Sequence, residues 1–393
     1  MVIKEARRIQ KVEEYYFSTK LSEIRHIEKK GEKVINLGIG NPDLPPSHST
    51  INAVKISAEQ AGNHGYQSYK SSDELREAFS DFYKNTYDVN LDAETEILPL
   101  RGSKEGIMFI SMAFLNPGDV VLLPNPGYPT YTSVSRMLDA EIIYYGLKEE
   151  NNWQIDIDEL KKTDLSQVKI MWINYPNMPT GAVASKELYD ELIKLAEQNN
   201  FLLCNDNPYS LVLNNDPKSF LSAVSAKGVG LELNSLSKSH NMAGWRLGWA
   251  AGNREYIKSV LKVKSNIDSG IFLPLQHAAI EALKNTKDWH EERDKEMYKR
   301  REKVFSLLDQ LHCTYNTNQV GMFVWAKLPE GELSSTTFVD EILDQARVFI
   351  TPGILFGSNG EGFIRVSLCN SIQKIEEANL RIKKYFQLKT VNK

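Results

Sequence analysis

The chain of 393 residues carries a formal net charge of −4, with 41% hydrophobic and 25% charged residues. This length suits one large domain with a smaller companion, and the composition is that of an ordinary globular protein. Because the net charge is so small, the composition excludes a general attraction to nucleic acid or to an acidic membrane surface.

Cysteine usage and the first residues bear on the compartment. The cysteines are Cys204, Cys313 and Cys369, and no two of them form a CxxC pair. So sparse a set favours a reducing compartment and argues against a disulfide framework or a zinc site. The N-terminus has no apolar signal region, and no run of about 18 apolar residues predicts a membrane helix. We therefore expect a cytoplasmic protein that binds neither membrane nor metal.

The predicted elements begin with a charged helix at 4–30, which ends at Gly31. VINLGIG follows as a short strand that runs into the loop GNPDLPP. Helical patterns then alternate with short apolar runs, which predicts βαβ units and an α/β fold with a mostly parallel central sheet flanked by helices. The helical patterns cover 49–61, 72–87, 103–115, 128–138, 185–199 and 253–265. The apolar runs are VVLLP, EIIYY, VKIMWIN, FLLCND and VGLELNS.

The pattern changes after about residue 280. A long charged helix at 286–311 is followed by the strand GMFVWAKL, a helix at 336–346, the strand FIRVSLC and a terminal helix. This order predicts a smaller α+β unit. In open α/β sheets ligands bind beyond the carboxyl ends of the strands, so the loops after the apolar runs are the candidates for a site.

Several common site motifs are absent. LGIGNPD has Asp43 where a dinucleotide fingerprint needs glycine, and WHEERD has Asp294 where a zincin helix needs its second histidine. The sequence contains neither a P-loop nor a G-x-S-x-G motif. Dehydrogenase, P-loop, serine-hydrolase and zinc chemistries are therefore disfavoured.

The stretch SLSKSHNMAGWRLGW places Lys238 in a loop after a predicted strand. Ser235 and Ser237 can bind an anion, and Arg246 adds a cation whose shape suits phosphate. A lysine that is partly desolvated near another cation has a lowered pKa and attacks carbonyl groups. A cofactor with both an aldehyde and a phosphate, pyridoxal 5′-phosphate (PLP), fits these residues.

This stretch resembles the Schiff-base lysine motif of the class I/II aminotransferases, which are fold-type I PLP enzymes. The other loops match the same family in order from residue 34 to residue 367, and GSKEGI and YPNMPTGA resemble the branch that contains LL-diaminopimelate aminotransferases. The resemblance implies transamination between an L-amino acid and a 2-oxo acid. It also implies that Lys238 holds PLP as an internal aldimine and moves the proton between substrate and cofactor.

The resemblance assigns further residues to the cofactor. Asp206 would pair with the pyridine nitrogen, Tyr209 would donate to the phenolate oxygen, and Tyr128 would stack on the ring. The backbone N–H groups of Ser103 and Lys104, at a helix start, would bind the phosphate.

One loop departs from the family pattern. The family has asparagine directly before Pro-Thr-Gly as a donor to the phenolate oxygen, but this chain has Met178 there. Either Asn174 or Asn177 takes its place, or Tyr209 is the only close donor to that oxygen.

The resemblance also reaches the substrate and a second subunit. It implies that Arg365 binds the substrate α-carboxylate bidentately, assisted by the backbone N–H of Gly40. Tyr66 would reach the phosphate of the neighbouring subunit, which makes the protein a homodimer, and Ser71 stands in the same segment where the family has glycine.

The implied large domain spans 48–280, and the small domain combines 1–47 with 281–393. In the first helix Tyr15, Tyr16 and Phe17 either fold over the site entrance or form only the apolar face of the helix, and sequence alone favours the apolar face.

Two alternatives remain. A fold-type I carbon–sulfur β-lyase would share every cofactor residue, and product analysis would distinguish the two enzymes. A non-enzymatic PLP-binding regulatory domain needs a DNA-binding partner, for which the short segment before LGIGNPD leaves little room.

Overall fold

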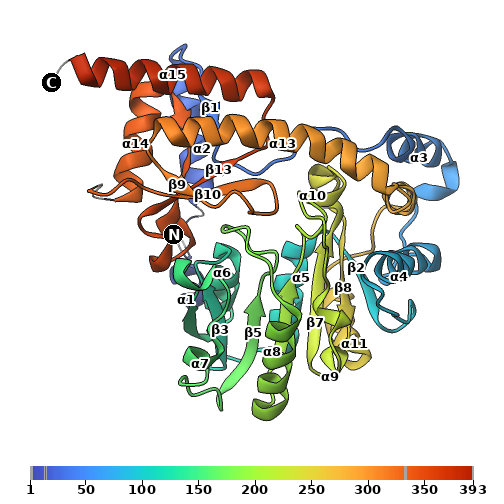
Figure 1. Cartoon of the computed structure of the whole chain (residues 1–393). Coiled ribbons are helices and arrows are strands. Elements are labelled where there is room, and N and C mark those ends of the chain that lie inside the picture. Colours follow the sequence, from blue (N-terminus) through green and yellow to red (C-terminus); the bar gives the residue numbers. More distant parts are fainter. Residues whose placement is uncertain (1–2, 13, 15, 332–333, 392–393) are drawn as a thin grey trace.

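The computed structural model describes residues 3–12, 14, 16–331 and 334–391. Within these residues, a seven-stranded sheet carries helices on both faces, and a smaller four-stranded sheet lies beside one end of it (Figure 1). The large sheet has the order β2-β8-β7-β6-β5-β3-β4. Its strands are β2 (Ile97–Leu100), β3 (Val120–Asn125), β4 (Glu141–Gly146), β5 (Val168–Ile173), β6 (Leu202–Asp206), β7 (Gly230–Ser235) and β8 (Gly248–Gly252).

The large sheet is parallel except at β8, which pairs antiparallel with both β7 and β2. This confirms the predicted α/β fold with a mostly parallel sheet. The apolar-run pattern did not reveal β8, because GWAAG consists of small residues around one tryptophan rather than β-branched ones. It did not reveal β2 either, whose Pro99 is tolerated because β2 lies at the sheet edge.

Strands β3, β5, β6 and β7 are buried on both faces almost throughout, which explains why they are mostly apolar runs, whereas the edge strand β4 is largely exposed or only partly buried. Successive side chains of a strand point to opposite faces. Accordingly, Leu122 and Leu203 join one apolar cluster, whereas Val121 and Leu202 join another. The helices of the first cluster are α4 (Asp73–Tyr87), α8 (Lys186–Asn199), α9 (Ala226–Val229) and α12 (Leu273–Ala282). Those of the second are α5 (Ser103–Phe114), α6 (Pro129–Met137) and α11 (Arg254–Lys264).

Helix starts follow the capping residues of the sequence. The Ser72 hydroxyl accepts from the backbone N–H of Leu75 at 3.2 Å, and the Ser185 hydroxyl accepts from that of Leu188 at 3.1 Å. These bonds satisfy donors that the first helical turn leaves open. The predicted helices at 72–87 and 185–199 are therefore confirmed to within one residue at their starts.

The smaller unit is built around an antiparallel sheet with the order β12-β13-β10-β9, which confirms the predicted α+β unit. Its strands are β9 (Thr314–Tyr315), β10 (Phe323–Lys327), β12 (Thr351–Pro352) and β13 (Phe363–Ser367). Its helices are α13 (Lys287–Gln310), α14 (Ser335–Ala346) and α15 (Ile372–Val391). Strand β1 (Ile35–Asn36) pairs in parallel with β11 (Val348–Phe349), so the N-terminal segment joins the C-terminal elements.

The single helix predicted at 4–30 is wrong. The chain forms a short α1 (Arg7–Gln10) and a separate α2 (Tyr16–Lys29). The side chains of Arg7 and Lys11 pair with Asp139 at the end of α6, whereas α2 buries Ile24 against the smaller unit. Only α2 has an apolar face to bury, and this explains why the helix does not continue through both segments.

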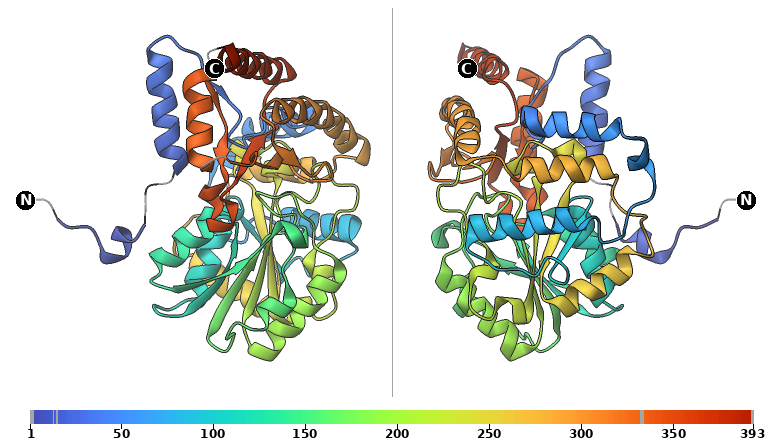
Figure 2. Two further views of the ribbon diagram at one scale, coloured as in Figure 1. Left: turned by 60° about the vertical axis from the view of Figure 1, so that its left-hand side comes forward. Right: turned by 90° about the vertical axis from the view of Figure 1, so that its right-hand side faces the viewer.

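Short elements complete the chain, and Figure 2 shows α3 and α12 side by side. They are α3 (His48–Ala58), α7 (Ile157–Leu160), α10 (Leu236–Ser239) and the 3₁₀ turns at 61–64, 149–151, 220–222, 243–245, 353–356 and 358–360. In the part of the chain that the structure describes, none of the helices has both the length and the apolar character needed to cross a membrane.

Candidate active site

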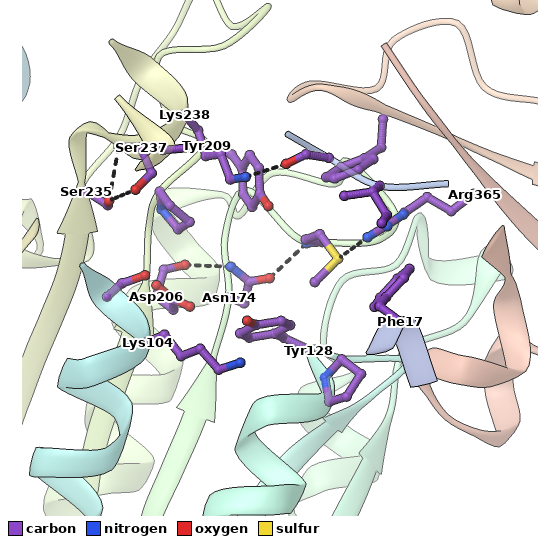
Figure 3. Close-up of a pocket in the computed structure, with 18 of the residues that line it drawn as sticks. Phe17, Lys104, Tyr128, Asn174, Asp206, Tyr209, Ser235, Ser237, Lys238 and Arg365 are labelled. Carbon is purple, nitrogen blue, oxygen red and sulfur yellow. Dashed lines mark hydrogen bonds between the residues drawn. The ribbon is translucent and has the colours of Figure 1, made fainter. Parts of the chain in front are cut away.

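A cavity of about 580 Å³ lies between the carboxyl ends of the large sheet and the smaller unit (Figure 3). All predicted site residues except Asn177 and Tyr66 line it. The lining residues are Phe17, Ser18, Leu21, Ile39, Gly40, Ser103, Lys104, Tyr128, Pro129, Asn174, Met178, Asp206, Pro208, Tyr209, Ser235, Ser237, Lys238, Ala243, Arg246, Phe323, Phe356 and Arg365.

Lys238 lies on α10, a single helical turn that begins directly after β7. The Ser235 hydroxyl caps this turn by accepting from the backbone N–H of Ser237 at 3.1 Å. Lys238 Nζ reaches across the cavity and donates to the carbonyl oxygen of Gly40 at 2.6 Å. Burial lowers the pKa of Lys238 to about 8, Cys369 opposes the shift, and Arg365 and Arg246 add to it. The amine is therefore far easier to deprotonate than an ordinary lysine.

One end of the cavity gathers groups that bind anions. Helix α5 begins at Ser103 with its first N–H groups next to Arg246. Gly102 has a φ of +91°, and a Cβ there would lie 2.3 Å from Arg246 Nη2, so only glycine fits. Arg246 Nη1 also donates to the Ser237 hydroxyl at 3.4 Å. A helix start, two serine hydroxyls and a guanidinium together suit a phosphate group.

Asp206, the last residue of β6, is buried at the floor of the cavity. The Tyr131 hydroxyl donates to its Oδ2 at 2.9 Å, while Oδ1 has no hydrogen-bond partner among the described residues. Burial raises the pKa of Asp206 to about 7, opposed by the Tyr131 hydroxyl. A buried carboxylate oxygen without a partner requires a donor, and a protonated ring nitrogen would supply one.

The two candidate asparagines differ in position. Asn174 lines the cavity, donates to the backbone oxygen of Asp206 at 2.6 Å and accepts from the backbone N–H of Met178 at 2.8 Å. Asn177 does not line the cavity, and its Oδ1 instead accepts from the hydroxyl of Thr180 at 2.8 Å. The cavity lining therefore favours Asn174 over Asn177, whose Oδ1 holds a turn while its Nδ2 is buried without a hydrogen-bond partner among the described residues.

Arg365 lies buried on β13, at the opposite side of the cavity from α5 (Figure 3). Its Nη2 donates to the carbonyl oxygen of Gly38 at 2.8 Å, and its Nη1 contacts Met178 Sδ at 3.0 Å. The guanidinium lies over the Phe323 ring, with its Cζ 3.9 Å from the ring centroid. Aromatic contact stabilises a cation away from water, so the guanidinium is held in place for an anionic ligand.

Tyr66 is 93% exposed and lies outside this cavity. In the same loop, Ser71 adopts a φ of +64°, the left-handed conformation that glycine adopts easily. The loop therefore keeps a glycine-like turn although the residue is serine.

Sequence analysis missed part of the lining. Phe17, Ser18 and Leu21 of α2 reach the cavity, so for Phe17 the less favoured alternative holds, while Tyr15 falls outside the described residues. Phe323 and Phe356 were missed because apolar residues in a strand and a turn carry no signal beyond core packing. Only the spacing of Phe17 and Leu21, four residues apart on one helix face, could have indicated a shared role.

Comparison with known proteins gives the family. The family model described as aminotransferase class I and II matches residues 32–382. The chain is 40% identical to the LL-diaminopimelate aminotransferase of Dehalococcoides mccartyi strain 195, over 95% of this chain and 97% of that protein. It is also 40% identical to the enzyme of that name from Aquifex aeolicus, over 90% of this chain and 92% of that one.

The chain belongs to the class I and II aminotransferases. Solved structures agree with this family: substrate-bound BacF from Bacillus subtilis is 35% identical, covers 98% of both chains and superposes with a TM-score of 0.93. An aminotransferase from Staphylococcus aureus is 29% identical and superposes with a TM-score of 0.88, covering 98% of this chain and 100% of that one.

As a class I and II aminotransferase, the protein is a PLP-dependent enzyme that catalyses transamination. Its cavity fits that cofactor, because Asp206 Oδ1 is buried without a hydrogen-bond donor among the described residues and the first N–H groups of α5 can bind a phosphate. The comparisons do not favour the β-lyase or the regulatory-domain alternative.

Proposed function

We propose that this cavity transfers the amino group between an L-amino acid and a 2-oxo acid, with Lys238 as the residue that moves the proton. The observation that carries the proposal is the position of the Lys238 amine, which is partly buried in the same cavity as Asp206 and Arg365. Desolvation lowers its pKa to about 8, so the amine can act as a base. Neutral Lys238 takes the proton from the substrate α-carbon and, as an ammonium, returns it to the cofactor side.

The cofactor contacts follow from the chemistry of the donors. Ser103, Ser235, Ser237 and Arg246 hold the phosphate, and Asp206 keeps the ring nitrogen protonated. Bound PLP supplies an electron-accepting ring that stabilises the carbanion left when the α-proton departs. The role of Asp206 is electrostatic, because an ionised carboxylate in a buried site strongly favours the protonated form of the ring nitrogen.

The remaining contacts orient both partners. Tyr128 stacks on the ring, Tyr209 and Asn174 donate to its phenolate oxygen, and the Lys104 backbone N–H adds to the phosphate site. Arg365 meets both oxygens of the α-carboxylate, and the Gly40 backbone N–H assists it. The Gly40 carbonyl, which accepts from Lys238 at 2.6 Å, also keeps the amine next to the reacting carbon.

Lys238→Ala tests this proposal. Borohydride treatment should fix the cofactor to the peptide that carries Lys238 in the wild type, and the variant should lose this label together with about 10²- to 10⁴-fold in single-turnover rate. Lys227→Ala is the matched control, since Lys227 pairs with Glu96 at 2.9 Å outside the cavity. Wild-type turnover by Lys238→Ala would refute the role of Lys238.

We also propose a homodimer in which Tyr66 completes the phosphate site of the partner. The exposure of Tyr66, together with that of Tyr69 and Phe272, supports such a contact. Tyr66→Ala and Lys238→Ala chains, each weak alone, should regain activity when mixed, because a mixed dimer then holds one intact site. No regain in a mixture shown to exchange subunits would place the phosphate site within a single chain.

We further propose that the large domain spans 48–280 and that the small domain combines 1–47 with 281–393. One apolar core lies almost wholly within 75–282, and a second is drawn mostly from 35–37 and 297–382, joined by Met178, Tyr209, Val212 and Leu213. The cytoplasmic location rests on the cysteine usage. LL-diaminopimelate, the compound in the names of the relatives, is one candidate amino donor, along with other α-amino acids.

A further inference from the structure

One wall of the cavity comes from α2, far from the strand ends that supply most of the site. Phe17, Ser18 and Leu21 face the cavity from one side of this helix, and Ile39 and Phe356 continue the same wall. Phe356 and Phe17 lie next to Arg365, which we call the carboxylate clamp, and their ring centroids are 4.7 Å and 5.7 Å from Arg365 Cζ. We refer to these residues as the α2 wall, of which Phe17 is labelled in Figure 3.

The α2 wall faces the space that remains for a donor side chain. A bound donor directs its carboxylate to Arg365, and its amino group and α-hydrogen lie toward Lys238. Asp206 and the start of α5 hold the opposite end of the cavity. The fourth substituent of the α-carbon, the side chain, then extends along the lining that none of these groups uses.

The chemistry of that lining selects among donors. Among the described residues that line the cavity, the charged ones are Lys104, Asp206, Lys238, Arg246 and Arg365. Asp206, Lys238, Arg246 and Arg365 serve the cofactor or the donor carboxylate in the proposed function, and Lys104 starts α5 beside Arg246 rather than on the α2 wall. A charged donor side chain against Phe17 and Leu21 would lose water without gaining a partner.

We propose, resting on the proposed function, that the α2 wall is a side-chain subsite that selects apolar and aromatic amino donors over donors with a charged side chain. The subsite is fixed relative to Arg365. Lys20 of α2 pairs with Asp340 of α14 at 2.8 Å, and Ile24 is buried with Leu343 and Phe349. The α2 wall and Arg365 therefore belong to the same unit. Whenever a donor binds Arg365 through its carboxylate, its side chain is placed against the α2 wall.

Burial in such a subsite is worth about fourfold in affinity for each methylene group removed from water. Methionine, leucine and phenylalanine should then react at least about tenfold faster than alanine at low donor concentration. LL-diaminopimelate, glutamate and aspartate should fall below these apolar donors by about tenfold or more, since the subsite offers no partner to the side-chain carboxylate of glutamate and aspartate or to the ammonium and carboxylate at the far end of LL-diaminopimelate.

The experiment measures the half-reaction of the PLP-loaded enzyme with each donor alone, from the change in the visible absorption of the bound cofactor. This removes the 2-oxo acid from the comparison. The second-order rate constants of phenylalanine, leucine, methionine, alanine, glutamate, aspartate and LL-diaminopimelate are then ranked. Activity with any of them upholds transamination, whereas the order tests the subsite, so the two proposals fail separately.

Variants link the order to the wall. Phe17→Ala should lower the rate constant for phenylalanine and leucine about tenfold or more but that for alanine less than about threefold. Ile27→Ala is the matched control, because Ile27 packs against the same buried cluster as Phe17 but does not line the cavity. It should leave the order of donors unchanged. Leu21→Arg should raise the rate constants of glutamate and LL-diaminopimelate relative to that of leucine.

Two results would overturn the subsite. The first is a charged donor at the top of the wild-type order, above all LL-diaminopimelate with a rate constant that Lys104→Met specifically lowers. The second is an equal loss for alanine and phenylalanine in Phe17→Ala, which would mean that Phe17 only supports Arg365.

Discussion

The ring end of the cavity (Ser103, Asp206, Lys238 and Arg246) is assembled from the ends of neighbouring strands and the turns that follow them, all on the large sheet. The donor end (Phe17, Leu21, Phe356 and Arg365) is assembled from a helix near one end of the chain and from a 3₁₀ turn and a strand near the other. The ring end is rich in charges and hydroxyls, whereas at the donor end one guanidinium lies among aromatic rings. The cofactor, which is the same in every reaction, thus faces polar and charged residues. The donor side chain, which differs from one amino acid to the next, faces a mostly apolar surface.

The largest effect is expected at the ring end. Asp206→Ala should leave PLP bound through the phosphate site but slow proton abstraction by about 10²- to 10³-fold, because the ring nitrogen loses the carboxylate that keeps it protonated. Single-turnover absorbance measures the rate, and the bound cofactor is quantified in the same sample. Tyr131→Phe, which removes only the hydroxyl on Oδ2, is the milder control. A wild-type single-turnover rate in Asp206→Ala would show that the Asp206 carboxylate is not needed for proton abstraction.

Lys238 should also make the free energy of unfolding of the cofactor-free protein depend on pH. Its pKa is about 8 in the folded chain and 10.5 ordinarily, so between these values the unfolded state binds more protons. The free energy of unfolding should therefore rise with pH across this window, by up to about 3 kcal/mol. Urea titrations at about pH 7.5 and about pH 10.5, near the two ends of this window, measure the rise. The Lys238→Met chain should lack this part of the rise and Lys227→Met should keep it; the same rise in Lys238→Met would contradict the burial of the amine.

At the donor end, Arg365→Lys should lower kcat/KM for α-amino acids about 10- to 100-fold while PLP binding is unchanged, because an ammonium replaces a planar fork. If the clamp also aligns the α-hydrogen, kcat falls together with the rise in KM. Decarboxylated amines should be poor substrates of both enzymes and no worse for the variant. Arg347→Lys, a substitution outside the cavity, is the control. An unchanged KM in Arg365→Lys would locate the carboxylate site elsewhere.

The smallest effect separates the two asparagines. Asn174→Ala should shift the pH midpoint of the bound cofactor's visible band, because Asn174 is the asparagine that lines the cavity. Asn177→Ala should leave that midpoint in place and lower the free energy of unfolding by about 1 kcal/mol, since its bonds to Thr180 hold a turn. A midpoint shift in Asn177→Ala, with none in Asn174→Ala, would reverse the assignment.

Sequence reasoning reached the two ends of the cavity unequally. The ring end could be predicted because catalytic loops follow apolar strands, and residues such as Lys238 and Asp206 are chemically conspicuous there. At the donor end Arg365 was conspicuous as a charge in an apolar strand. Phe17 and Leu21 were not, because an apolar residue on a helix has the same pattern whether it faces a core or a ligand. Strand β8 was missed for a related reason: its small residues have little intrinsic preference for a strand, and they form one because they pack between β2 and β7.

The positions of these residues along the chain also set an order in time. Ser103 to Arg246 form one continuous stretch that contains the ring end, whereas Arg365 comes 119 residues after Arg246. At a synthesis rate of about 5–20 residues per second, the ribosome makes the last ring-end residue roughly 6–24 s before the carboxylate clamp. A growing chain thus carries the residues that hold the cofactor, and also Phe17 and Leu21 of the α2 wall, well before the arginine that binds the donor carboxylate, so a partly made chain lacks the group that orients a donor.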